Sequence, residues 1–222
     1  MPVDNIALRK LLQLLYLPPN KRKSKLRGEI RSQISKEDDP QGGGGGDFHT
    51  PFWSDAKLHV ARQIDLSKST AARINDNRTR SRLYPLLEEG FRAWWREETR
   101  WRNEQIDYVP DRVKSNLVLT DLGAVIKVEN LMTLGVEDAG HMHVYPYFSE
   151  EPVLCEEAAR IGLWVMNRAF NGAHADLRIL DILRSKCFKI IDQKFDGDEE
   201  EIVISRYGAL LREWEELKAE YP

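Results

Sequence analysis

The fold is decided by the run Ala124-Val-Ile-Lys-Val-Glu-Asn-Leu-Met-Thr-Leu134 and by the run His141-Met-His-Val-Tyr-Pro-Tyr-Phe148 that follows it. Side chains of a strand alternate between two faces. One face of the first run carries Ile126, Val128, Asn130, Met132 and Leu134. Residues 137–140, Glu-Asp-Ala-Gly, have the composition of a turn. We therefore expect two strands that pair as a hairpin.

The segments on either side of this hairpin read mainly as helices. After it we expect a helix over residues 156–170, a third strand over 177–183 that continues through 187–191 after a turn at 184–186, and a helix over 199–220. Before it we expect a helix from Asp4 or Asn5 to Tyr16, a basic helix over 21–34 and three helices within 51–103. The sequence thus predicts an α+β fold, with a helical N-terminal half, a small β-β-α-β sheet unit and a C-terminal helix.

Five consecutive glycines, Gly42–Gly46, divide the chain. Such a run loses much backbone entropy on ordering and buries no side chain, so it is typical of a flexible linker. We expect a basic helical arm over residues 1–36, a Gly-rich linker over 37–50 and a single α+β domain over 51–222. Within that domain, residues 51–105 should be helical and residues 117–222 mixed.

Composition excludes several classes of protein. Two cysteines are too few for a secreted disulfide scaffold of 222 residues. No apolar run approaches the ~20 residues that span a bilayer, and the first residues lack the pattern of a signal peptide. We expect a soluble protein of the cytoplasm with no membrane partner. The sequence predicts neither its oligomeric state nor a required cofactor.

The two ends of the chain carry opposite charge. Residues 1–36 hold nine basic residues against two acidic ones, whereas residues 192–222 hold ten acidic against four basic. A second basic stretch precedes the Trp-rich helix near residue 94. Phosphate contacts use such side chains, and the candidates are Lys21, Arg22, Lys23, Lys25, Arg78, Arg80 and Arg82. The alternative is that the basic helix is neutralised by the acidic C-terminal segment, or is solvated.

His141 and His143 form a candidate metal pair. Residues two apart on a strand share a face, where two imidazole nitrogens can bind one ion at ~2.1 Å each. The alternative is two histidines on an exposed strand face beside a turn, because two ligands alone are a weak pattern.

The layout of an amphipathic helix, a hairpin, a helix and a further strand resembles the core of the PD-(D/E)XK, or restriction-endonuclease-like, superfamily. The run from Ile126, the run Tyr145-Pro-Tyr-Phe-Ser-Glu-Glu-Pro and the helix that ends Leu163-Trp-Val-Met are also similar to an uncharacterised bacterial protein family. The resemblance implies an acid on one strand and an acid-x-Lys on the next, which bind Mg²⁺ or Mn²⁺ and activate water.

This chain departs from that pattern where chemistry would occur. The position of the acid-x-Lys reads Tyr145-Pro146-Tyr147, and a phenol with a pKa near 10 is no carboxylate ligand. The remaining candidates for catalysis are Glu129, Lys127 and Glu89, unless Glu129 and Lys127 are simply a charged pair on a strand. The leading interpretation is a non-catalytic domain that binds nucleic acid or a protein. The alternatives are a weak metal-dependent nuclease or phosphodiesterase, and a complex component that docks through its basic N-terminal helix.

Overall fold

The computed structural model describes residues 3–38, 48–100, 106–110, 113–136, 140–174 and 176–221. It confirms the α+β class. The glycine run 42–46 and the turn residues 137–139 lie outside the described ranges. The helices of eight or more residues are α1 (Leu8–Tyr16), α2 (Pro19–Asp38), α3 (Thr50–Val60), α4 (Leu66–Asp76), α5 (Tyr84–Arg100), α6 (Glu156–Ala169) and α7 (Glu199–Lys218). The strands are β1 (Asn5–Ala7), β2 (Ile106–Val109), β3 (Ser115–Leu119), β4 (Ala124–Val128), β5 (Met132–Val136), β6 (Gly140–Tyr147), β7 (Asp176–Asp181) and β8 (Lys186–Lys189).

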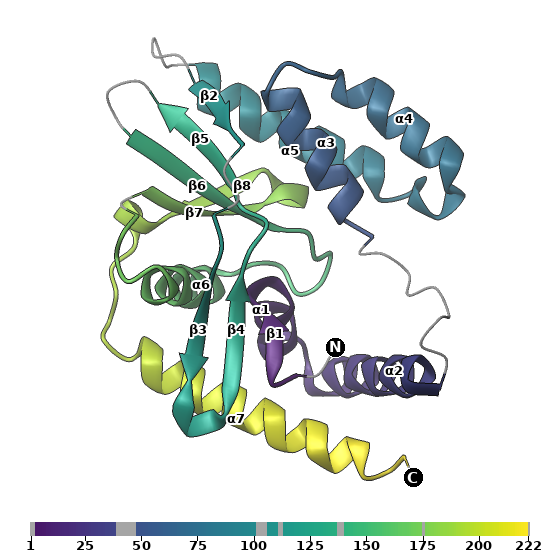
Figure 1. Ribbon diagram of the computed structural model, residues 1–222, viewed down its shortest axis with the longest axis vertical. Coiled ribbons are helices and arrows are strands. Elements are labelled where there is room, and N and C mark those ends of the chain that lie inside the picture. The colour runs from purple at the N-terminus through teal and green to yellow at the C-terminus, as the bar shows by residue number, and fades with distance from the viewer. Residues whose placement is uncertain are drawn as a thin grey trace.

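The strands form two sheets (Figure 1). The main sheet has the order β2-β5-β6-β7-β8, in which β6 and β7 are parallel and the other neighbours antiparallel. The parallel pair is connected through α6, as a crossover between parallel strands requires. The small sheet has the order β1-β4-β3, in which β1 runs parallel to β4. The expected hairpin is present as β5 and β6, and the expected third strand as β7.

The run 124–134 is not the single strand that its alternation predicts. Asn130 has φ 66°, in the left-handed region, and breaks the run between β4 and β5. Ile126 therefore faces one hydrophobic cluster and Met132 faces the other. The prediction was wrong because alternation records the period of a strand and not its direction, and asparagine adopts the left-handed conformation more easily than most residues.

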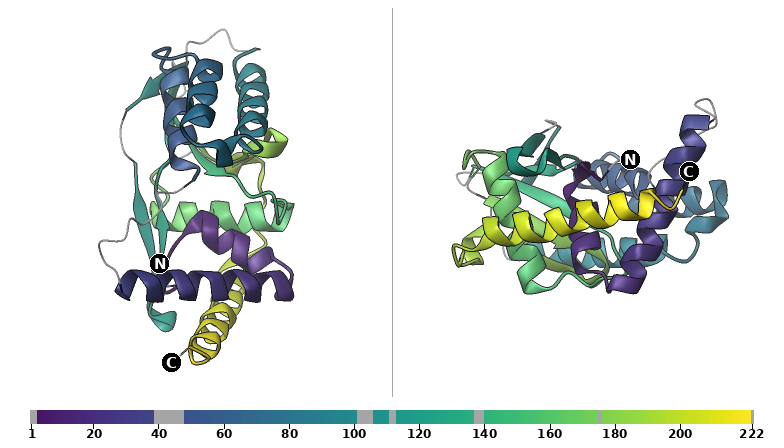
Figure 2. Two further views of the ribbon diagram at one scale, coloured as in Figure 1. Left: turned by 90° about the vertical axis from the view of Figure 1, so that its right-hand side faces the viewer. Right: turned by 90° about the horizontal axis from the view of Figure 1, so that it is seen from below.

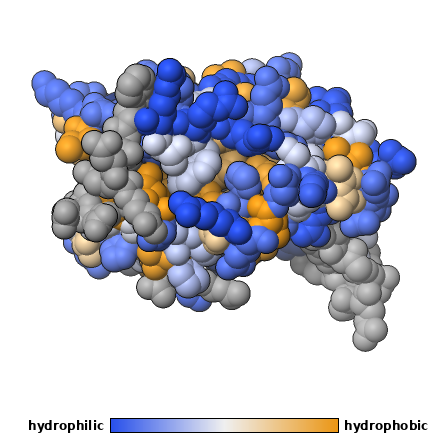
Figure 3. All heavy atoms as spheres, turned by 90° about the horizontal axis from the view of Figure 1, so that it is seen from above, coloured by the Kyte–Doolittle hydropathy of each residue, from blue (hydrophilic) through white to orange (hydrophobic). Residues whose placement is uncertain are grey.

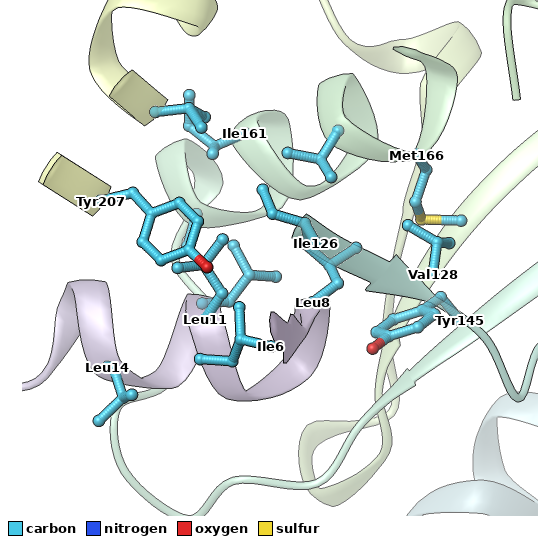
Figure 4. Packing of buried hydrophobic residues seen from close by; sticks show 14 of the residues in the cluster. Ile6, Leu8, Leu11, Leu14, Ile126, Val128, Tyr145, Ile161, Met166 and Tyr207 are labelled. Atoms are coloured by element: carbon cyan, nitrogen blue, oxygen red, sulfur yellow. The ribbon is translucent and has the colours of Figure 1, made fainter. Parts of the chain in front are cut away.

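The N-terminus begins as a strand, which corrects the helix expected from Asp4 or Asn5. Residues Asn5–Ala7 pair with Val125–Lys127 of β4, and α1 starts only at Leu8. Leu8, Leu11 and Leu12 are completely buried. Figure 4 shows Leu8 and Leu11 packed with Ile126 of β4 and Ile161 of α6. Residues of the expected arm thus belong to the same core as α6 and α7.

The basic helix α2 packs on the C-terminal helix α7 (Figure 2). Arg22 Nε lies 2.6 Å from a carboxylate oxygen of Glu213, and Arg27 Nη2 lies 3.0 Å from one of Glu220. The charge difference between the two ends of the chain is therefore partly cancelled by direct contact. On this face of α2, the acidic C-terminal segment neutralises the basic helix, as one of the two alternatives expected.

Helices α3, α4 and α5 form a layer on the opposite face of the main sheet from α6. Asp65 caps α4, because it accepts a hydrogen bond from the backbone N–H of Lys68 at 3.0 Å. The polar interruption in the apolar face of α5 is Glu98, whose carboxylate lies 2.9 Å from Nη1 of Arg178 on β7. Both side chains are buried, so the ion pair joins the helical layer to the sheet.

No helix within the described ranges is both long and apolar enough to cross a membrane. Seen from above the view of Figure 1, hydrophobic residues are scattered among hydrophilic ones (Figure 3). The large exposed apolar side chains lie on separate elements and are Leu86, Val118, Val153 and Ile191.

Candidate functional site

A cleft of about 840 Å³ lies where the N-terminal segment, α3 and the ends of two strands meet. Strands β1 and β4 are parallel, so their carboxyl ends point the same way, and Ala7 and Glu129 line the cleft. Phe148 and Ser149, directly after β6, also line it. Ligands of mixed and parallel sheets commonly bind beyond the carboxyl ends of strands. The volume falls within the range of pockets that hold ligands of nucleotide size.

Three cations gather around one acid on the N-terminal wall of this cleft. Arg9 and Lys10 lie in the first turn of α1, and Lys25 comes from α2. Lys10 Nζ is 2.6 Å from a carboxylate oxygen of Glu29, whereas no carboxylate in the described part of the chain lies at ion-pair distance from Lys25. Burial lowers the pKa of Lys25, Glu29 opposes that change, and the positive charges of Lys10 and Arg9 add to it.

The same wall presents the N-terminus of α1. This end carries partial positive charge from unpaired backbone N–H groups. No acidic residue lies in its first turn and no side chain caps it. One of its N–H groups, that of Arg9, donates to the hydroxyl of Tyr145 at 2.8 Å. Basic residues in a first turn oppose the helix dipole, and an anion in the cleft would offset that cost.

Aromatic rings contact Arg9, His49 and Lys57 at the cleft. The guanidinium carbon of Arg9 lies 5.4 Å from the ring centroid of Phe148, and the imidazole of His49 stacks on Phe148 at 4.7 Å between ring centroids. Lys57 Nζ lies 5.8 Å from the ring centroid of Trp53. Cations over aromatic faces gain an electrostatic attraction that fixes their positions. The positive groups on the two walls are thus held toward one space.

The acidic residues of the cleft are mostly neutralised. Besides Glu29, Glu150 binds Arg82 through two bonds of 2.6 Å, and Glu151 binds Lys21. Glu129 is the remaining carboxylate of the lining. The cleft is therefore more attractive to anions than its equal number of acidic and basic lining residues indicates.

The three residues predicted for catalysis do not converge. Glu129 follows β4 and lines the cleft. Lys127 lies on β4 opposite Asn116 and Ala7 and is not among the lining residues. Glu89 is exposed on α5, also outside the lining.

The tyrosines at the position of the acid-x-Lys are both hydrogen-bonded. Tyr145 accepts from the backbone of Arg9, and Tyr147 donates to the carbonyl of Pro152 at 2.8 Å. Burial raises the pKa of Tyr147 to about 12, so its phenol stays protonated at neutral pH. Neither side chain can supply the carboxylate that the family pattern has there.

Carboxylates converge at a different place. Among the described residues, the one group of three metal-ligand types within 4.8 Å of one another is Asp196, Asp198 and Glu199, near the start of α7. The guanidinium Nη1 of Arg160 already contacts all three carboxylates. This group is a network of ion pairs around an arginine.

The residues predicted to contact nucleic acid are dispersed. Lys25 lines the cleft, Lys21 lies at its rim through Glu151, and Lys23 is exposed on α2. Arg22 is engaged with Glu213 of α7.

The three arginines of the second basic stretch do not line the cleft, and only Arg82 contacts a lining residue, Glu150. Arg78 is exposed, Arg80 lies over the ring of Tyr84, and Arg82 pairs with Glu150. Of the two basic stretches, the first is the one that contributes a side chain to the cleft.

His141 and His143 do share a face of β6, as alternation predicts, with 6.3 Å between their ring centroids. They lie outside the cleft lining. His143 is buried, and its Nδ1 lies 3.2 Å from Oγ1 of Thr133 on β5.

No family model matches the chain, and a search of curated proteins finds no match.

Sequence reasoning missed Arg9, His49 and Lys57. The available signal was Arg9-Lys10, because two basic residues at the start of a helix are unfavourable unless an anion binds there. Because the helix was expected to start at Asp4 or Asn5, Arg9 and Lys10 were assigned to its second turn and not to its N-terminus. His49 and Lys57 come from the other wall, and no local pattern relates them to Arg9.

Proposed function

We propose that the protein binds single-stranded nucleic acid without cutting it, and that a phosphate group enters the cleft between α1, α2 and α3. The observation that carries the proposal is Lys25. It is a half-buried ammonium without a carboxylate at ion-pair distance in the described ranges, and it faces the same cleft as the start of α1. A phosphate would supply the missing negative charge.

The size and the chemistry of the cleft favour this ligand over a protein partner. A space of about 840 Å³ admits one nucleotide unit of a flexible strand. Protein partners usually cover a core of apolar residues, and the exposed apolar side chains of the described residues are scattered. A nucleotide suits a cleft in which cations lie next to aromatic rings, because its phosphate can contact the cations and its base can stack on a ring.

The order of elements is in line with the PD-(D/E)XK-like layout expected from the sequence. Helix α5 precedes the hairpin β5–β6, with β2, β3 and β4 between them, and helix α6 and strand β7 follow the hairpin. The cleft lies at the ends of β4 and β6. Of the expected catalytic residues, only Glu129 lines this cleft. We infer a degenerate member of that layout that keeps nucleic-acid binding and lacks the metal-dependent step.

The test is binding of a labelled single-stranded oligonucleotide to the full chain at several salt concentrations. Phosphate contacts release counterions, so the affinity should fall as salt rises from about 50 to about 200 mM. Lys25→Gln removes one contact and should reduce the slope of log K against log salt by about 0.7. Lys23→Gln, an exposed lysine on the same helix, is the matched control and should bind as the unmodified protein does.

Binding that does not respond to salt, or an equal loss in Lys25→Gln and Lys23→Gln, would overturn the proposal. The absence of cleavage is tested separately, with Mn²⁺ and the same oligonucleotide. We expect intact oligonucleotide with the unmodified protein and with Glu129→Gln. Cleavage that disappears in Glu129→Gln would instead establish the nuclease alternative.

A further inference from the structure

Three of the five histidines of the chain gather on the α6 side of the main sheet. His141 and His143 are separated by 6.3 Å between ring centroids and are nearly parallel, with 25° between their planes. The ring of His174 lies 4.1 Å from that of His143. The third histidine extends the pair on β6 to a cluster outside the cleft.

The sheet brings the third histidine to this place. Strands β6 and β7 are parallel, and His143 is opposite Leu177 in their register. His174 lies three residues before Leu177, so it enters the sheet beside the start of β6. The ring of Phe170, directly after α6, makes an edge contact of 4.8 Å with His174 and holds it against His143.

Thr133 orients the central imidazole. Its hydroxyl lies 3.2 Å from Nδ1 of His143, which leaves Nε2 as the ring atom available to another group. Histidines that bind metals typically have the second nitrogen engaged in this way.

We propose that His141, His143 and His174 together bind one divalent transition-metal ion of the zinc type. Imidazole nitrogens suit Zn²⁺, Ni²⁺ and Cu²⁺ rather than Mg²⁺. The neighbouring carboxylate of Asp176 is held by Arg178 through bonds of 2.7 and 2.8 Å, so the three imidazoles are the ligands that remain. Three protein ligands leave a coordination position open to solvent.

Binding requires side-chain movement, because the ligand atoms of the three imidazoles do not all lie within 4.8 Å of one another. His143 is buried, whereas His141 is exposed, and exposed side chains change rotamer rapidly. The proposal therefore includes a rotation of the His141 side chain toward the other two.

The experiment is calorimetric titration of the full chain with Zn²⁺ alone, followed by His141→Ala and His59→Ala. His59, on α3, has Nδ1 3.2 Å from the carbonyl oxygen of Ile64 and serves as the matched control. We expect one ion per chain, an affinity about tenfold or more lower in His141→Ala, and no change in His59→Ala. Because His141 is exposed, its loss should leave the fold intact, as circular dichroism would confirm.

A second variant examines the role of Thr133. Thr133→Val keeps the shape of the side chain but removes the hydroxyl, and it should weaken Zn²⁺ binding by about tenfold. Co²⁺ in place of Zn²⁺ should give visible absorption bands that His141→Ala changes. Zn²⁺ binding that is absent from the unmodified protein, or equally strong in His141→Ala, would overturn the proposal.

Discussion

Residues 3–38 and residues 48–100 are both mainly helical and form opposite walls of the cleft, yet they join the sheets differently. The first segment adds strand β1 to the small sheet and buries Leu8, Leu11 and Leu12 against elements more than 100 residues later. The second adds no strand: its helices contact one another and pack on one face of the main sheet and on residues 182–184. One segment is part of the central core, and the other is a helical layer over the main sheet.

The two segments also differ in whether certain basic side chains have a carboxylate partner. In residues 48–100, Arg73 binds Asp55 through two bonds of 2.9 and 3.0 Å, and Arg92 pairs with Glu88. In residues 3–38, Lys25 faces the cleft without such a partner in the described ranges. A segment can thus be essential to the core and still supply the charge for a ligand.

The largest expected effect tests whether the N-terminal segment is core. Leu12 is completely buried and lies so close to Gly162 of α6 that a Cβ added there would come within 2.9 Å of its Cδ1. Leu12→Ala should lower the free energy of unfolding by about 2–5 kcal/mol in urea titrations. Leu86→Ala, on the exposed side of α5, should change it by about 0.5 kcal/mol or less. Equal effects would contradict the placement of Leu12 in the core.

A smaller effect compares one glycine from each segment. A Cβ on Gly90 of α5 would lie 1.9 Å from the backbone oxygen of Ile182, whereas a Cβ on Gly28 of α2 would meet nothing within 4 Å. Gly90→Ala should destabilise the protein by about 1–3 kcal/mol through overpacking. Gly28→Ala should stabilise it by about 0.5–1 kcal/mol, because alanine loses less entropy in a helix. The melting temperatures of both variants measure these effects. An unchanged melting temperature for Gly90→Ala would contradict the close contact between α5 and the backbone of Ile182.

These contrasts also explain what could be predicted from the sequence. The three helices α3, α4 and α5 and the order β5, β6, α6, β7 were predicted correctly, because period, caps and turns are local signals. Strand β1 was missed because its three residues acquire their structure from β4, more than 100 residues away. The division of the run 124–134 was missed because a single left-handed residue, Asn130, redirects the chain without disturbing its alternation.

The candidate site was predicted only in part. Lys25 and Glu129 were among the expected residues, and both line the cleft. Arg9, His49 and Lys57 were not, because they become neighbours only when α1 and α3 approach the ends of β4 and β6. His174 could not be related to His141 and His143 either, since the relation depends on the parallel register of β6 and β7.

The most direct test of the central claim is amide hydrogen exchange of the full chain with and without a saturating single-stranded oligonucleotide. The two basic stretches then serve as each other's control. We expect slower exchange in the first turn of α1, around Arg9 and Lys10, and at residues 129–130, with no change around Arg78–Arg80. Protection around Arg78–Arg80 with none at the start of α1 would contradict the assignment of nucleic-acid binding to the cleft.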